Sequence, residues 1–211
     1  MDAHNDLHAK AEAGDSKAQF DLGLLYANGD GVLRDSKEAI KWYRKSAEQG
    51  NSWAQHNLGL MYMHGDGVSR DDIEALRWFR KAADQGIAIS QYNLGVAYVQ
   101  GTGMLNVEEA LKWFRKAAAQ DYAPALFNIT EICKRGFGMP GERDKILEQL
   151  RKTAEDGNAD SQCVLGRIYV LDAKYFVKGA REEALKWLQK AADQGHAAAQ
   201  SMIRALIRYG A

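Results

Sequence analysis

The sequence predicts an all-α fold, an α-solenoid of about five helix–turn–helix repeats closed by a capping helix at each end. Three observations predict it. A phrase around Trp42, Trp78, Trp113 and Trp187 recurs, with these tryptophans 36, 35 and 74 residues apart. A second phrase, containing Ala-Gln, Leu-Gly and tyrosine, comes before it, and glycine pairs separate the two. A fixed period of this length is typical of solenoids, in which each repeat buries its apolar face against its neighbours.

The second phrase predicts the first helix of each repeat, which we call helix A. In the first copy it consists of Ala18-Gln19, Leu22-Gly23 and Tyr26. Leucine, glycine and tyrosine at i, i+1 and i+4 share one helical face, and the glycine lets a neighbouring helix approach closely. Glycines such as Gly29 and Gly31 then end the helix, because glycine accepts positive φ.

The tryptophan phrase predicts the second helix, helix B. Asp35, Asp71 and Asn106 stand where its N-cap is expected. A glutamate follows each of them three residues later, and this spacing predicts a capping box. The three glutamates are Glu38, Glu74 and Glu109.

The two phrases divide the chain into repeats within a single domain, 1–211. The repeats are 15–50, 51–86, 87–121, 122–157 and 158–195, with a cap over 1–14 and a closing helix over 196–211. The fourth repeat is degenerate. Ile129, Thr130 and Cys133 replace its leucine, glycine and tyrosine, and Gln149-Leu150 replaces its tryptophan and aromatic residue. The third turn reads Gly101-Thr102-Gly103, and the fifth is longer, over 171–179.

These motifs resemble the Sel-one-like repeat (SLR) family, a relative of the tetratricopeptide (TPR) repeats. The resemblance covers 15–211 and rests on Ala-Gln-x-x-Leu-Gly-x-x-Tyr, Gly-x-Gly-Val and Trp-Tyr-Arg-Lys. It implies a right-handed α-solenoid that serves as a protein–protein adaptor, mostly in bacteria. A cysteine-rich branch of the family, linked to penicillin binding, places a disulfide in every repeat. This chain lacks that cysteine pattern, so that activity is not expected here.

Charge and composition exclude several classes of partner. Twenty-eight basic and 28 acidic residues balance, which argues against nucleic acid or an anionic membrane as the main partner. No run of 18 apolar residues is present to insert into a membrane. The first residues show no signal-peptide pattern, so we expect a cytoplasmic protein, with export of a trimmed form as the open alternative.

Catalytic and metal-binding motifs are missing from the sequence, which predicts no enzyme, no cofactor and no metal site. His56, His64 and Met63 can share one helical face, but two histidines without a third ligand make a poor metal site. Cys133 and Cys163 are expected as a reduced pair in or near the core.

Trp53 differs from the four periodic tryptophans, which are expected to stack in the core. It falls out of register, at the second position of its helix A. By analogy with TPR proteins, helix A positions −5, −2, +2, +5 and +6 relative to the leucine of Leu-Gly line the concave surface, with Trp53 among them.

This analogy predicts a partner-binding surface that is apolar at its start and basic at its end. Apolar surface and aromatic or arginine residues are typical of partner sites. The predicted residues are Phe20, Leu24, Trp53, His56, Leu60, Met63, His64, Ile89, Tyr92, Val96, Phe127, Lys134, Arg135, Arg167 and Arg208. The open alternatives are burial of these residues between adjacent A helices and a weak homodimer through the same apolar concave face.

The function expected from these observations is a non-catalytic adaptor that binds a peptide or protein on its concave face. One alternative is a dedicated inhibitor, such as an immunity protein for a bacterial toxin, which would bind one partner far more tightly. A cell-wall-related hydrolase is the alternative of another class. It would require a paired nucleophile and base, which the sequence does not offer.

Overall fold

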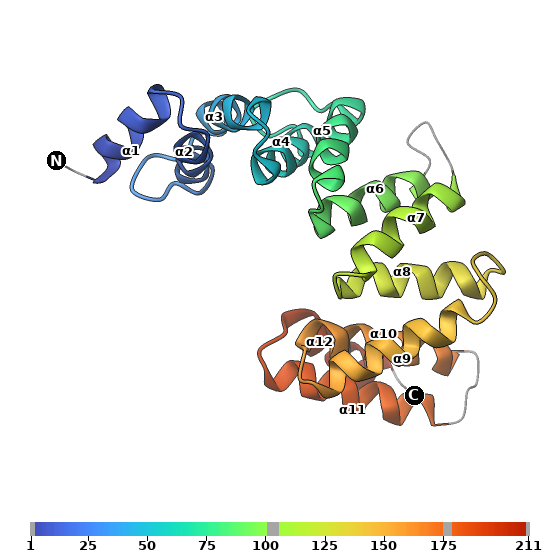
Figure 1. Cartoon of the computed structure of the whole chain (residues 1–211). Helices are drawn as coiled ribbons and strands as arrows, with labels where there is room; N and C mark the ends of the chain where they lie inside the picture. Colours follow the sequence, from blue (N-terminus) through green and yellow to red (C-terminus); the bar gives the residue numbers. More distant parts are fainter. Residues whose placement is uncertain (1–2, 101–105, 175–178, 210–211) are drawn as a thin grey trace. The chain divides into compact units, whose positions relative to one another are not determined.

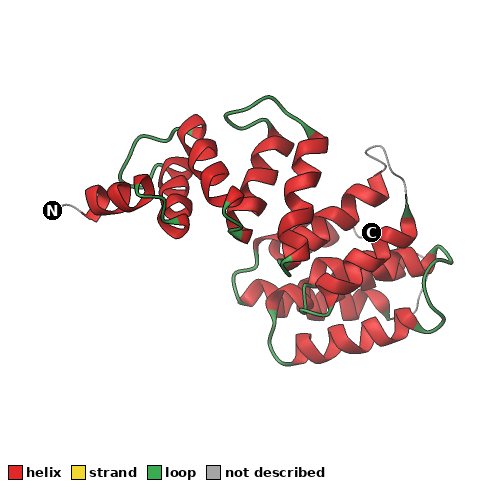
Figure 2. Cartoon of the chain, turned by 45° about the horizontal axis from the view of Figure 1, so that its top comes forward, coloured by secondary structure: helices red, strands yellow, loops and turns green. Residues whose placement is uncertain are grey.

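The structure is a computed structural model that describes residues 3–100, 106–174 and 179–209. These residues form twelve α-helices and no strand, as the sequence predicts (Figures 1 and 2). The chain divides into two compact units, unit 1 (Met1–Trp113) and unit 2 (Phe114–Ala211). The expectation of a single domain stays a prediction.

Unit 1 contains the N-terminal cap and the first repeats. Its helices are α1 (Ala3–Glu12), α2 (Ser16–Asn28), α3 (Ser36–Glu48), α4 (Ser52–His64), α5 (Asp72–Asp84), α6 (Ala88–Gln100) and the first part of α7 (Val107–Ala118). From α1 to α6, each helix packs against the next.

Unit 2 contains the end of α7 and the last repeats. Its other helices are α8 (Ala123–Lys134), α9 (Glu142–Glu155), α10 (Ala159–Lys174), α11 (Ala180–Asp193) and α12 (Ala197–Tyr209). Here α10 packs against α8, α9 and α11, and α12 packs against α11. In both units every A helix begins one residue after the predicted start of its repeat.

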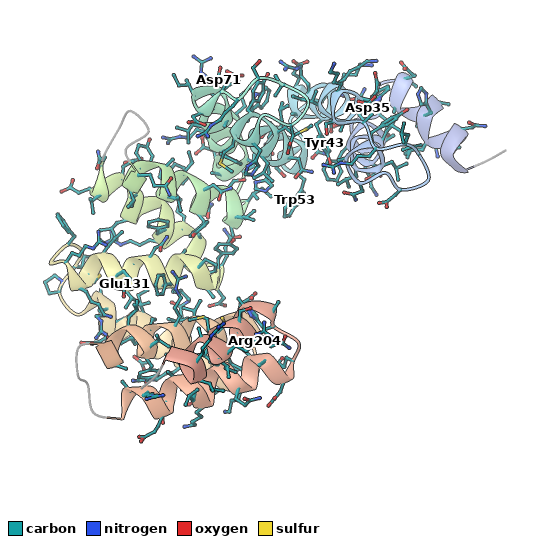
Figure 3. The ribbon with its side chains drawn as sticks, turned by 180° about the vertical axis from the view of Figure 1, so that it is seen from behind. Asp35, Tyr43, Trp53, Asp71, Glu131 and Arg204 are labelled. Carbon is teal, nitrogen blue, oxygen red and sulfur yellow. The ribbon has the colours of Figure 1, made fainter. Side chains whose placement is uncertain are left out.

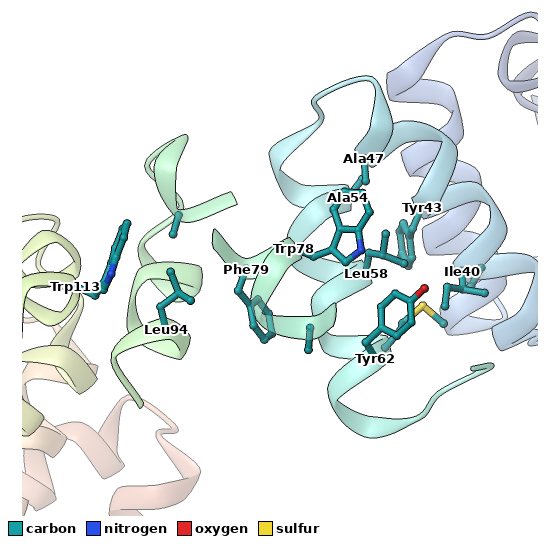
Figure 4. Packing of buried hydrophobic residues seen from close by; sticks show 14 residues of the cluster. Ile40, Tyr43, Ala47, Ala54, Leu58, Tyr62, Trp78, Phe79, Leu94 and Trp113 are labelled. Carbon is teal, nitrogen blue, oxygen red and sulfur yellow. The ribbon is translucent and has the colours of Figure 1, made fainter. Parts of the chain in front are cut away.

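The periodic tryptophans are core residues, as expected. Trp42 and Trp113 are 1% exposed, and Trp78 and Trp187 are 5% exposed. Figure 4 shows Trp78 packed among the helices of unit 1, in a cluster that includes Leu58. Burying such large rings supplies much of the hydrophobic stabilisation of each repeat.

The glycine of each Leu-Gly pair lies directly against the aromatic residue of helix B. A Cβ on Gly23 would lie 2.7 Å from the Tyr43 ring, and one on Gly59 would lie 2.8 Å from the Phe79 ring. Any larger residue would separate the two helices. The predicted close approach at this glycine is therefore confirmed.

The glutamine of the Ala-Gln pair joins successive repeats through buried hydrogen bonds. In unit 1, the side-chain amides of Gln19, Gln55 and Gln91 donate to backbone carbonyls of the preceding B or cap helix at 3.0, 3.0 and 3.1 Å. Gln162 does the same in unit 2, at 2.9 Å. The helix that precedes each glutamine thereby gains a partner for an otherwise unpaired C-terminal carbonyl.

The predicted N-caps of the B helices are confirmed, but the capping boxes do not form. Asp35 accepts hydrogen bonds from the backbone of Lys37 and Glu38 at 2.8 and 3.1 Å, and Asp71 and Asn106 cap in the same way. The backbone N–H of each cap residue instead donates to a helix A tyrosine carbonyl, as Asp35 does to Tyr26 at 2.9 Å. Since this N–H is already satisfied, the glutamate is free to contact a lysine or arginine three residues later.

The glycine turns between helices A and B follow the prediction where the structure describes them. Gly29 and Gly65 end α2 and α4 with φ of 81° and 77°. A Cβ on Gly67 would lie 2.4 Å from the backbone oxygen of Ser36, so the turn also packs against the preceding repeat. The predicted turn at 101–103 and part of the longer turn at 171–179 lie outside the described residues.

Candidate partner-binding surface

Unit 1 carries the apolar part of the predicted surface on its three A helices, α2, α4 and α6. Its residues are partly or fully exposed, with the exception of His56. They are Phe20 and Leu24 on α2, Trp53, Leu60, Met63 and His64 on α4, and Ile89, Tyr92 and Val96 on α6. We call this set the A-helix face of unit 1.

Trp53 is the most prominent aromatic side chain of this face. It is 52% exposed, whereas the four periodic tryptophans are buried. In Figure 3 it projects from α4 away from the ribbon of unit 1. Its ring contacts that of His56 edge to face, with the centroids 6.1 Å apart. The structure thus fixes one side of the indole and leaves the rest open to a partner.

His56 does not lie on the surface where the sequence analysis placed it. It is 4% exposed, and its Nδ1 lies 2.8 Å from the hydroxyl oxygen of Ser90 on α6. Its ring also packs near Phe79, with the centroids 5.6 Å apart. Burial disfavours the charged imidazolium and lowers the pKa of His56 to about 4. His56 therefore joins two repeats and supports Trp53 from behind.

Phe127 in unit 2 is also buried, at 7% exposure, although the sequence analysis placed it on the surface. The guanidinium of Arg167 lies over its ring at 3.9 Å, a distance typical of a cation–π contact. Arg167 itself is exposed. At this point unit 2 therefore presents arginine, and not an open aromatic ring.

The other basic residues of the predicted surface differ in how they are used. The Lys134 ammonium lies 3.2 Å from Glu131 and 2.8 Å from Asp172, so neighbouring carboxylates already compensate its charge. Arg135 and Arg208 are exposed. We therefore expect a weaker field from this group than the sequence suggests.

Two residues that contribute to this region were missed by the sequence analysis. Ser90 occupies the alanine position of the Ala-Gln pair, and it is the hydrogen-bond partner of His56. Asn57 precedes the leucine of Leu-Gly and is hydrogen-bonded to the Tyr43 hydroxyl. The signal was present, because both positions can be compared between repeats, but it has meaning only when the opposite helix is known.

The chemistry of the described part of the chain was also examined for metal and redox sites. No three histidine, cysteine, aspartate or glutamate side chains gather there as metal ligands. Cys133 and Cys163 are free thiols whose pKa burial raises. Of the helices described, none has the length and hydrophobicity needed to cross a bilayer.

Comparison with solved structures places the chain among bacterial repeat proteins. A protective antigen with an SLR fold from uropathogenic Escherichia coli is 37% identical, with a TM-score of 0.73, over 99% of this chain. A Sel1 repeat protein from Oxalobacter formigenes is 31% identical, with a TM-score of 0.74, over 98% of this chain. The chain spans 45% of the E. coli protein and 89% of the O. formigenes protein.

More distant structures share the fold. An immunity protein from Pseudomonas aeruginosa is 24% identical, with a TM-score of 0.57, over 87% of this chain and 67% of its own length. No curated protein matches the chain at a significant level.

The Sel1 repeat model matches residues 16–51, 54–87, 88–122 and 159–196, which is more than half of the chain. The segment without a match, 123–158, is the degenerate fourth repeat. Sel1 repeat proteins are scaffolds for interactions between proteins. The repeats, the fold and these matches together show that the chain belongs to the Sel1 repeat family.

Proposed function

We propose that this protein is a non-catalytic adaptor that binds a protein or peptide partner on the A-helix face of unit 1. The observation that carries the proposal is the exposure of Trp53, 52%, against 5% or less for the periodic tryptophans. Leaving an indole in water forfeits the gain from burying it, and a partner that covers it recovers that gain. Tryptophan is among the residues most enriched at binding hot spots.

The neighbours of Trp53 favour an apolar contact. Leu60 and Met63 follow it on α4, while Ile89 and Val96 lie on α6, and all four are partly exposed. Contiguous apolar surface of this kind marks interaction sites. A partner that presents apolar side chains fits this face better than a highly charged one.

Arginines of unit 2 supply a second, electrostatic contribution. Arg135, Arg167 and Arg208 are exposed, and arginine binds carboxylates with paired hydrogen bonds. We assign them to steering of an acidic part of the partner, which changes association rates more than affinity. Lys134 is left out of this role because Glu131 and Asp172 already pair with it.

A dedicated toxin inhibitor remains the alternative within the binding class. The likeness to a Pseudomonas immunity protein, at 24% identity, supports a common fold and not a common partner. Affinity separates the two functions. An inhibitor should hold one partner at nanomolar strength or below, whereas an adaptor should hold several partners more weakly.

Affinity capture from the source organism, followed by mass spectrometry, tests the proposal. The full chain is compared with Trp53→Ala and with Ile73→Ala, a control on α5 whose side chain is 68% exposed. Partners retained by wild type and Ile73→Ala but lost by Trp53→Ala support the proposal. Equal capture by all three proteins contradicts it. Light scattering of the purified chain shows whether the same face forms a homodimer.

A further inference from the structure

The position just before the leucine of Leu-Gly carries a polar residue in four successive repeats. It is Asp21, Asn57, Asn93 and Asn128, and it becomes Val164 in the fifth. On helix A this residue is next to the predicted surface positions, since it follows Trp53 or Ile89 by four residues. A position that can be valine does not need an amide for packing.

In the second repeat the amide has a structural partner. Asn57 is hydrogen-bonded to the hydroxyl of Tyr43 on the preceding B helix. Tyr43 is buried, and this burial raises its pKa to about 12, while the hydrogen bond from Asn57 opposes the rise. Asn57 therefore satisfies a hydroxyl that would otherwise lose its partner inside the protein.

In the third repeat that partner is gone. Phe79 stands where Tyr43 stands one period earlier, and it has no hydroxyl. Asn93 is half-buried, and its side chain makes no hydrogen bond with the described residues. In the fifth repeat the opposite residue is Leu150, and there the asparagine has become Val164. Asn93 thus keeps an amide without a partner in the fold.

The surroundings of Asn93 identify what the amide can bind. Ile89 and Val96 are close to it on the same face of α6, and both are partly exposed. Helices α4 and α6 contain no aspartate, glutamate, lysine or arginine. A charged group would therefore find no counter-charge on either helix. One carboxamide offers an acceptor and two donors, which complement the N–H and C=O of a peptide main chain.

We propose that Asn93, assisted by Asn57, hydrogen-bonds the main chain of an extended, uncharged peptide segment, whose apolar side chains pack on Trp53 and Ile89. This inference rests on the proposed function and specifies its ligand. Main-chain recognition suits an adaptor, because it grips many sequences while the apolar contacts select among them.

The test uses dodecapeptides selected from a phage-displayed random library against the full chain, then synthesised with single N-methyl groups along the backbone. Asn93→Leu imitates the natural valine of the fifth repeat and keeps a good helix former. It should fold with a melting temperature equal to or above that of wild type, yet bind the peptide about tenfold more weakly or worse. Asn5→Leu, an exposed site on α1, is the matched control and should bind like wild type.

N-methylation separates main-chain contacts from side-chain contacts. At one backbone position the N-methyl group should weaken binding to wild type and have no further effect on Asn93→Leu. Failure to select any peptide, unchanged binding by Asn93→Leu, or a lower melting temperature of this variant overturns the inference. If partners captured by the full chain still depend on Trp53 in that case, the proposed function stands and only the peptide mode is lost.

Discussion

Arg115 and Glu142 form a two-point ion pair in unit 2, with Nε and Nη2 of the arginine 2.6 and 2.8 Å from the two carboxylate oxygens. The carboxylate is 7% exposed and also accepts the backbone N–H of Met139 at 2.9 Å. The hydrogen bond from Arg115 is the main reason why the pKa of Glu142 is lowered. The pair fastens the start of α9 to the end of α7.

This ion pair replaces a contact that the other repeats share. In unit 1, Arg44 and Arg80 donate to the hydroxyls of Tyr62 and Tyr98, eighteen residues later. Arg151 donates to Tyr169 in unit 2 at the same spacing. Eighteen residues after Arg115 the tyrosine is replaced by Cys133. Glu142 supplies the missing acceptor.

Glu142→Gln should lower the free energy of unfolding by about 3 kcal/mol, because it leaves the guanidinium of Arg115 without its counter-charge in a partly buried site. Urea unfolding followed by circular dichroism measures this change. Adding Cys133→Tyr to Glu142→Gln restores the acceptor used in the other repeats, and should recover part of the loss. A Glu142→Gln protein as stable as wild type would show that the ion pair contributes little.

His56 should make unit 1 sensitive to mild acid. Its pKa is about 4 in the folded protein and about 6.5 in the unfolded chain. Between these values the unfolded chain binds the proton and the folded protein does not, so stability falls as pH decreases from 6.5 to 4. The full effect is roughly 3 kcal/mol below pH 4, from 1.36 kcal/mol per pKa unit.

The control for this effect is the double variant His56→Phe/Ser90→Ala, which places the residues of the first repeat, Phe20 and Ala18, at both positions. Thermal unfolding between pH 4 and 7 compares it with wild type. The difference in stability between the two proteins should change across this window. Parallel pH profiles would mean that His56 is not the titrating group.

The fourth repeat should open more readily than the second. Gln149 and Leu150 replace a tryptophan and an aromatic residue there, and solenoid stability is approximately a sum of such local contributions. Hydrogen exchange should therefore show faster exchange for α9 than for α5. Equal protection would mean that Leu150, which is fully buried, and the Arg115–Glu142 pair compensate for the lost rings.

Helix positions, N-caps, glycine turns and the tryptophan core could be predicted from the sequence because each follows from a periodic residue type. The role of Gln19 and its equivalents could not, since a recurrent glutamine reads equally well as surface. The capping boxes failed because the cap N–H already binds a carbonyl of the preceding A helix.

The candidate site was less predictable than the fold for a related reason. Position in the repeat showed that Trp53 departs from the pattern, and the structure exposes it. Position alone also put His56 and Phe127 on the surface. Their burial depends on a neighbouring helix: His56 bonds to Ser90 of α6, and Arg167 of α10 covers Phe127.

Arg167→Ala should slow the association of the partner, and this effect should shrink as salt screens the charge. Lys134→Ala is the matched control. Its charge is already paired with Glu131 and Asp172, so it should change association little. Stopped-flow association at low and high salt measures both. Equal salt dependence for both variants would remove Arg167 from steering.

The rate of dissociation from a partner captured by the wild-type chain tests the central claim most directly. Trp53→Ala should weaken binding by on the order of 2 kcal/mol, mainly through faster dissociation, with little dependence on salt and no loss of folding stability. Ile73→Ala on α5 should dissociate like wild type. If Ile73→Ala dissociates faster and Trp53→Ala does not, the partner binds the B helices, and the A-helix face of unit 1 is not the binding site.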